Sequence, residues 1–285
     1  MKKLISFCLF TLLLLGCEKP DFEAEQKKGQ ETEANLVVSV FQLEQTPFSA
    51  ISRTAVGDAC TRLNFAIYDE DGSRVKQTNQ QLGDADFGKA SFQLSKGTYQ
   101  LVVVGHSSSG NPTMTDPAKV QFTNATGYSD TFLYYEEVTI DDATQNLSVT
   151  LHRIVSLCRF VITDDYPQNV STMRFQYKGG SGAFNASTGF GSVNSTQTLE
   201  FSASTGTKQF DLYTFLHDTT GTIHLLVTAY DVNSNVLYEK EFDVPMVQNQ
   251  ISWLSGPYFS DSNTQTLSTT IDVNTDWAGE THYTF

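Results

Sequence analysis

The sequence predicts an all-β protein that folds as two antiparallel β-sandwiches in series, and three observations support this prediction. Apolar side chains recur at every second position in many short segments, of which residues 36–43 are the first. Glycine, proline, asparagine and aspartate lie between these segments. No segment shows the 3.6-residue period of an amphipathic helix. Short alternating segments separated by turn residues are typical of antiparallel sandwiches.

The first sandwich is expected at residues 36–150 and the second at residues 151–285. The expected strands are rich in β-branched and aromatic residues, which favour the pleated conformation. In the first sandwich they cover residues 36–43, 61–69, 90–94, 98–105, 120–122, 131–140 and 146–151. In the second they cover residues 169–177, 198–201, 208–216, 222–230, 236–244 and 250–254, with an alternating end at 267–273. Residues 152–163 are apolar on both faces, which predicts a strand covered on both sides at the domain boundary.

The N-terminus predicts export. Two lysines precede an apolar run from residue 4 to residue 15, which is followed by Gly16 and Cys17. A charged start, a short apolar core and a small residue before the cleavage point form a signal peptide, here residues 1–16. The run of about 12 residues is too short for a helix that spans a bilayer.

Cys17 is the expected lipidation site, because its position after the apolar run resembles the bacterial lipobox. In such lipoproteins the cysteine becomes the first mature residue, and two or more acyl chains anchor it stably. The alternative is an ordinary signal peptide with an incidental cysteine. Residues 17–35 are polar and acidic, so we expect a flexible tether there. Glu18, Asp21 and Glu23 fit either an export signal to the outer cell face or a solvated linker.

The charge of the chain argues against nucleic acid and anionic lipid headgroups as partners. The full sequence has 18 Lys and Arg against 32 Asp and Glu, a net charge of −14. Removal of residues 1–16 takes away two lysines and no acids, which leaves −16. Binding to phosphates or to an anionic membrane requires clustered basic side chains.

Two cysteines remain in the predicted domains, Cys60 and Cys158. They form one disulfide or stay as separate thiols, and the sequence leaves both interpretations open. The chain has no CxxC pair and no cysteine–histidine cluster, so no metal is expected. The lipid on Cys17 is the one attached group that the sequence implies.

Two glycine-containing segments resemble parts of active sites but lack the required residues. Residues 105–110 depart from the G-x-S-x-G nucleophile elbow, and the Asn-Pro pair that follows would stop the helix of that motif. Residues 179–182 lack the Lys-Ser/Thr end of a phosphate-binding loop. Both segments are interpreted as loops between strands.

The charged residues and histidines that could form a metal or catalytic site have equally little support. Residues 69–72 lack the later glutamate of a calcium-binding loop. His217 and His224 flank one turn, a position that would allow a metal across the hairpin. No other feature of the sequence supports such a site. Asp164 and Asp165 form a carboxylate pair that we interpret as solvated turn residues. No catalytic residue is therefore predicted.

Two tryptophans bear on a different class of function. Trp253 and Trp277 are placed near strand ends, where they either stack on sugars or fill the core. A surface lipoprotein that binds glycans and passes them to an outer-membrane uptake system is therefore the alternative hypothesis.

The order of several segments resembles a known family. The clearest is LHRIVSLCRF at residues 151–160, and the others are residues 97–104, 130–134, 167–170 and 175–177. In this order they resemble the fimbrillin-like subunits of type V pili in Bacteroidales, most of all the lipid-anchored anchor and accessory subunits. The resemblance covers roughly residues 36–285. It implies two transthyretin-like sandwiches with Greek-key topology, and no enzymatic activity.

The resemblance also implies assembly by strand donation, in which a sandwich that lacks one strand accepts an extended segment of a neighbouring subunit. It implies protease cleavage after an arginine near the first strand, for which Arg53 is the candidate. The candidate exchanged strand contains Leu36, Val38, Val40 and Leu43. The candidate donor strand, residues 266–285, contains Leu267, Ile271 and Val273. Arg53 as an ordinary loop residue, and residues 266–285 as a resident edge strand, are the alternatives.

The leading hypothesis is a non-enzymatic fimbrial subunit, of the anchor or the tip (accessory) type, held in the outer membrane by lipid and exposed at the cell surface. Its expected partners are other fimbrial subunits, with a host or bacterial surface ligand as a further candidate. Uncleaved Arg53 would suit an anchor, and cleaved Arg53 would suit a stalk or tip subunit. The sequence leaves both open.

Overall fold

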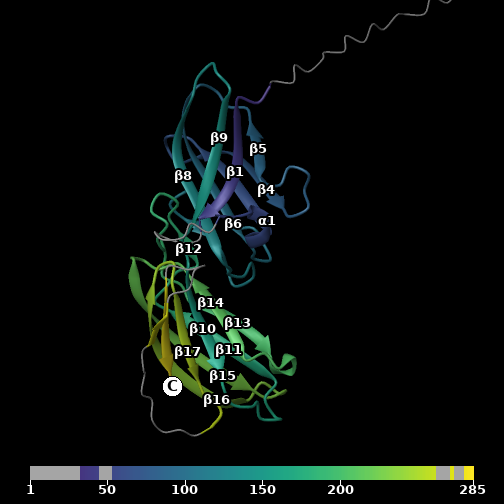
Figure 1. The fold of residues 1–285 in the computed structure, drawn as a ribbon, viewed down its shortest axis with the longest axis vertical. Helices are drawn as coiled ribbons and strands as arrows, with labels where there is room; N and C mark the ends of the chain where they lie inside the picture. Colours follow the sequence, from purple (N-terminus) through teal and green to yellow (C-terminus); the bar gives the residue numbers. More distant parts are fainter. Residues whose placement is uncertain (1–32, 45–52, 261–269, 273–278) are drawn as a thin grey trace, which may run out of the picture. The chain divides into compact units, whose positions relative to one another are not determined.

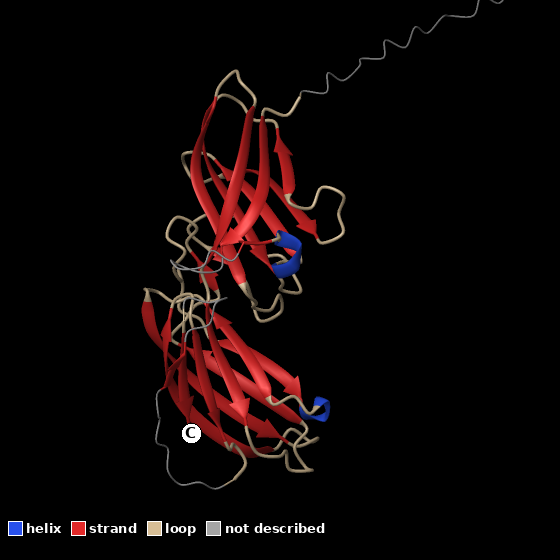
Figure 2. Ribbon diagram, in the orientation of Figure 1, coloured by secondary structure: helices blue, strands red, loops and turns tan. Residues whose placement is uncertain are grey.

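Nearly all regular structure in the computed structural model is β-strand (Figures 1 and 2). The structure describes residues 33–44, 53–260, 270–272 and 279–285. Contacts between residues divide the chain into Met1–Glu33 and the compact unit Ala34–Phe285. The all-β prediction is confirmed. The boundary predicted between residues 150 and 151 lies within one strand, and the division there stays a prediction.

The first half of the described chain forms one eight-stranded sheet. Its strands in spatial order are β2 (Arg53–Thr54), β1 (Leu36–Glu44), β9 (Gln145–Arg153), β8 (Thr131–Ile140), β6 (Gly97–His106), β3 (Arg62–Tyr68) and β4 (Arg74–Gln81), with β5 (Lys89–Phe92) also paired to β1. The four-residue helix α1 (Val56–Ala59) follows β2. Alternate side chains of these strands point to one core, which includes Leu63, Phe65, Leu101 and Phe132.

The second half contains two sheets that share a core. The strands of one are β14 (Gln209–Thr214), β10 (Ser156–Ile162), β17 (Ile251–Gly256), β19 (Glu280–Thr284) and β18 (Thr270–Asp272). The strands of the other are β13 (Gln197–Ser202), β11 (Thr172–Lys178), β15 (Thr220–Tyr230) and β16 (Val236–Val247), and the 3₁₀-helix η1 (Ala203–Thr205) follows β13. Their inward side chains, among them Phe160, Phe175 and Val227, make the sandwich core.

A third apolar cluster joins residues from both halves of the chain. The small sheet of β7 (Val120–Gln121) and β12 (Ala183–Phe184) supplies Val120 and Phe184 to it. The buried Tyr68 hydroxyl donates to the Met114 carbonyl at 2.8 Å. Ala34–Phe285 is therefore held together by side chains as well as by the chain connection.

Three ladders differ from the antiparallel expectation. The pairs β1–β9, β10–β17 and β17–β19 are parallel, whereas the other ladders are antiparallel. Parallel neighbours cannot be joined by a tight turn and need a long connection. The strands of β1–β9 and β10–β17 are far apart in sequence, and those of β17–β19 meet near the C-terminus. The alternation of apolar side chains alone therefore does not reveal that these pairs are parallel.

Candidate functional site

The candidate exchanged strand lies inside its sheet. β1 pairs with β9 on one side and with β5 and β2 on the other. Leu36, Val38 and Leu43 are fully buried, and Val40 packs against the same core from a half-buried position. Burying each such side chain contributes about 1.5–3 kcal/mol. Removal of β1 would therefore leave an apolar groove bordered by unpaired backbone groups.

A β-bulge changes the side to which part of β1 points its side chains. The register with β9 shifts between Val40 and Gln42, and the intervening Phe41 is 68% exposed. An extra residue on one strand of a ladder turns its side chain out of the alternating pattern. Leu43 consequently returns to the core side after the bulge.

Asn35 fixes the start of β1, although it is the last residue of the predicted tether. Its side-chain amide donates to the Leu94 carbonyl at 2.8 Å, and its carbonyl oxygen accepts from the Leu94 N–H at 3.0 Å. Its backbone N–H donates to Phe92, and its backbone carbonyl accepts from Gln145. The polar residue before the first apolar run was the only sequence signal of this role.

The candidate cleavage residue lies beside the end of β1. The backbones of Arg53 and Thr54 pair with Glu44 and Leu43 in a two-residue antiparallel ladder. A cut after Arg53 would separate β1 from the rest of the chain covalently. The core contacts and ladders of β1 would still hold it in place until another strand displaced it.

The candidate donor segment includes the C-terminal strand β19. β19 lies between β17 and β18, parallel to the first and antiparallel to the second. Ile271 belongs to β18, whereas Leu267 and Val273 lie outside the described residues. In this structure the candidate donor segment is thus a resident of its own sandwich, so donation would require its release.

Phe285 anchors the end of the C-terminal strand. Its ring stacks on Phe160 at 5.1 Å between centroids and contacts Phe242 at 4.7 Å. The chain passes so close to Gly256 that a Cβ there would lie 2.1 Å from the Phe285 carbonyl oxygen. Only glycine fits this approach. The candidate donor segment 266–285 included this strand, but its alternation was placed at residues 267–273, and none of these three contacts was predicted.

Trp253 is covered on both faces. The Arg159 guanidinium on β10 lies 4.9 Å from its ring centroid, and the His282 ring on β19 stacks at 5.1 Å. β17 lies between these two strands, so the two side chains flank the indole from opposite sides. The indole N–H donates to Glu280 at 3.0 Å. No face is left on which a sugar could stack, and Trp277 lies outside the described residues.

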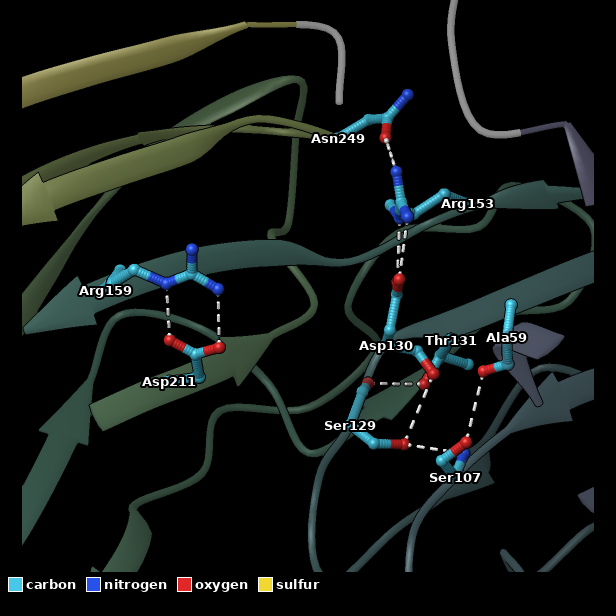
Figure 3. A network of polar contacts seen from close by, with 9 residues as sticks. All are labelled: Ala59, Ser107, Ser129, Asp130, Thr131, Arg153, Arg159, Asp211 and Asn249. Carbon is cyan, nitrogen blue, oxygen red and sulfur yellow. Dashed lines mark hydrogen bonds and ion pairs between the residues drawn. The ribbon is translucent and has the colours of Figure 1, made fainter. Parts of the chain in front are cut away.

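A buried ion pair links the strand ends near the middle of the chain (Figure 3). Arg153 donates from Nε and from one terminal nitrogen to the two carboxylate oxygens of Asp130, both at 2.7 Å. The Arg153 side chain is 2% exposed, and it also reaches the amide oxygen of Asn249. Nearby, the Ser107 hydroxyl donates to the Ala59 carbonyl and its backbone N–H to Ser129. These contacts join side chains and backbone groups of the fold to one another.

The remaining weak candidates take structural roles. Asp69 accepts backbone hydrogen bonds from Asp71 and Ser73 in its own turn. His217 contacts the Gly191 carbonyl, whereas His224 contacts Asp243, so the two histidines do not converge. Among the described residues no group of three His, Cys, Asp or Glu side chains could hold a metal.

Asp164 and Asp165 have different structural roles. Asp164 accepts from the backbone N–H groups of Tyr258, Phe259 and Ser260 and from the Ser260 hydroxyl. Burial raises the pKa of Asp164, but these hydrogen bonds together outweigh it and hold the pKa below its usual value. Asp165 pairs with Lys208 at the surface. They are no catalytic dyad.

Cys60 and Cys158 are both free and buried. They belong to different core clusters, so they do not pair. Burial raises the pKa of the Cys158 thiol to about 12 and also raises that of Cys60. Within the part of the chain that the structure describes, no helix is long and apolar enough to cross a membrane.

Comparison with protein families gives one match, which covers residues 44–282 and is described as fimbrillin-A associated anchor proteins Mfa1 and Mfa2. The chain belongs to this family. Comparison with curated proteins gives no match.

The solved structures that match this Mfa1/Mfa2-family protein share little sequence with it. A putative adhesin from Bacteroides ovatus is 15% identical over 81% of this chain and 88% of that chain, with a TM-score of 0.49. A fimbrial assembly protein from Parabacteroides distasonis is 14% identical over 82% and 93%, with a TM-score of 0.42. The fimbrial anchor protein Mfa2 from Porphyromonas gingivalis is 13% identical over 72% and 80%, with a TM-score of 0.39.

Family membership confirms the resemblance that the segment order indicated. It supports a fimbrial anchor or accessory subunit that associates with other fimbrial subunits at the cell surface. The family is one of structural subunits.

Proposed function

We propose that this protein is a lipid-anchored fimbrial subunit of the outer membrane, of the anchor or accessory type, that joins other subunits by strand donation and catalyses no reaction. Acyl chains on Cys17 hold it at the membrane, and residues 18–32 connect them to the folded unit. Trp253 does not support the glycan-binding alternative, because it is covered on both faces.

The placement of β1 is the observation that carries this proposal. A strand close to the lipid site fills an apolar groove with Leu36, Val38 and Leu43 while bonding to strands on both sides. A segment of another subunit with the same alternation would make the same backbone bonds and fill the same core positions. A cut after Arg53 would make such an exchange possible but would also detach the folded unit from the lipid, so an anchor keeps β1 in place and joins its neighbour through the C-terminal segment.

Mass spectrometry of the protein isolated from cell envelopes tests the anchor. A peptide that starts at an acylated Cys17, in a chain that continues past Arg53, is expected for an anchor. A chain that starts at Thr54 would instead identify a polymerising subunit. A Cys17→Ser variant should lose incorporated fatty acid and leave the envelope fraction, whereas Cys60→Ser should retain the fatty acid. An unacylated Cys17 in wild-type protein would overturn the proposal.

Truncation after Ser260 tests strand donation separately. The shortened chain lacks β18 and β19, and with them the core residues Tyr283 and Phe285, but it keeps the lipid site and the other seven strands of the sandwich. It should stay in the envelope and lose co-purification with fimbrial subunits. Undiminished co-purification would exclude the C-terminal segment as the donor.

A further inference from the structure

Several sheets of the folded unit end in strands that pair on one side only among the described ladders, and β4 and β16 are two of these end strands. β4 pairs only with β3, and β16 pairs only with β15. A free edge presents unpaired N–H and C=O groups that can form a ladder with another chain. The two edges differ in length, in charge and in the groove beside them.

The β16 edge is acidic and borders a groove. Glu239, Glu241 and Asp243 are exposed on one face of the strand, and Phe242 points to the core between them. A groove of about 610 Å³ runs along residues Glu239 to Asp243 and reaches Phe285. An incoming strand would thus meet exposed acids on one face of β16, whereas Lys240 and Phe242 alternate on the other face.

The β4 edge has the complementary pattern. Arg74, Val75 and Lys76 are all exposed, and Val75 is 41% exposed, one of few large apolar side chains that the described surface leaves uncovered. Alternation along the strand places both cations on one face and Val75 on the other. An incoming strand would meet a base, an apolar residue and a base.

We propose that β4 of one copy pairs with β16 of a second copy, with Val75 opposite Phe242 and the two cations opposite Glu241 and Asp243. Opposite charges on directly facing positions stabilise a ladder, and like charges destabilise it. Pairing of β16 with β16, or of β4 with β4, would bring like charges together. The charges therefore select the unlike pair, which is a heterologous contact that further copies can extend.

Two sets of charge reversals test this pairing in the purified full-length chain, with association measured by sedimentation. Arg74→Glu with Lys76→Glu makes both edges acidic, and Glu241→Lys with Asp243→Lys makes both edges basic. Each variant alone should associate at least about tenfold more weakly than wild type. A mixture of the two variants should recover association, because every β4 then finds a β16 of opposite charge.

Glu136→Lys with Glu137→Lys is the matched control, since it changes the net charge as much as the β16 reversal does. Both glutamates are exposed on β8, away from the two edges, so association should equal that of wild type. A wild-type chain that stays monomeric, or a mixture that fails to recover while both variants remain folded by circular dichroism, would overturn the proposal.

Site-specific cross-linking gives a second readout and the strand direction. A Lys76→Cys copy mixed with a Glu241→Cys copy should form a disulfide under a mild oxidant such as diamide if the pair is antiparallel, because a disulfide joins only directly opposite positions. An Asp243→Cys copy should do so if it is parallel. Cross-linking with neither copy contradicts the pairing even if sedimentation shows dimers. The native Cys60 and Cys158 are buried and should not react, and Cys8 and Cys17 are replaced by serine in both copies.

Discussion

His106 is held in its neutral form by its surroundings. Its ring is fully buried on Phe122, with Nε2 bonded to the Asn64 side-chain oxygen at 2.8 Å and Nδ1 accepting from the Ser108 N–H. Burial, and to a smaller extent the charge of Arg62, lowers its pKa to about 4. Because Nδ1 accepts and Nε2 donates, protonation would break the first of these bonds.

This lowered pKa predicts a loss of stability in acid. The unfolded chain binds a proton at His106 with a pKa of about 6.5, so the contribution of this group is complete above pH 6.5 and falls as the pH drops toward 4. The total loss is about 3 kcal/mol. Urea unfolding between pH 7.5 and pH 4 should show a steeper decline for wild type than for His106→Gln. Parallel curves would contradict the prediction.

Gly256 offers a test of how the C-terminal strand is held. A Cβ in Gly256→Ala would collide with the Phe285 carbonyl oxygen, so β19 should separate from β17 and exchange its amide hydrogens faster. Gly279→Ala is the control, because a Cβ at that position would only make an ordinary contact, 3.5 Å from Gln250. Equal exchange of β19 in both variants would mean that this close approach does not hold the strand.

At the scale of elements, strands that bury one face could be predicted from the sequence. Strands with mostly polar side chains and the parallel direction of some ladders could not. The predicted segments 131–140 and 222–230 match β8 and β15 within two residues, because their apolar alternation follows directly from one buried face. β4 was missed because most of its side chains are polar and exposed. Its strand state comes from pairing with β3 rather than from its own composition.

The candidate site was predictable in part for the same reason. Leu36, Val38 and Leu43 show their burial through alternation, whereas the bulge at Phe41 and the amide bonds of Asn35 depend on β9 and on residues near 94. The approach of Phe285 to Gly256 likewise joins segments that share no local pattern. Register and close contacts arise from tertiary packing, which composition does not encode locally.

The contribution of β1 to the free energy of unfolding can be measured with substitutions in this strand. Leu36→Ala removes a fully buried side chain and should cost about 2–5 kcal/mol of unfolding free energy. Phe41→Ala removes a larger side chain from the same strand, but one that is 68% exposed, and should change stability by about 0.5 kcal/mol or less. Equal costs in urea unfolding would show that β1 is not packed as described.

At the scale of the whole molecule, two bidentate Arg–Asp pairs allow a comparison of burial. Arg153–Asp130 and Arg159–Asp211 have the same 2.7 Å contacts, but the arginine side chains are 2% and 21% exposed (Figure 3). Arg153→Leu should destabilise the folded unit by about 3–5 kcal/mol, since it leaves a half-buried carboxylate without its ion pair. Arg159→Leu should cost about 1 kcal/mol. The reverse order in urea unfolding would contradict this assignment.

In the secreted lipoprotein proposed above, the parallel pairing of β1 with β9 would set an order of events during export. Residue 36 finds its neighbour only when residue 145 has crossed the membrane, and the ladder then closes a very long loop. Until that moment the first strand is an apolar stretch whose β9 side is unpaired, although β2 and β5 have already crossed and can pair with its other side. Enzymes that act on that end, whether they add lipid or cut the leader, therefore meet an unfolded substrate, and any chaperone of the exported chain has this stretch to cover first.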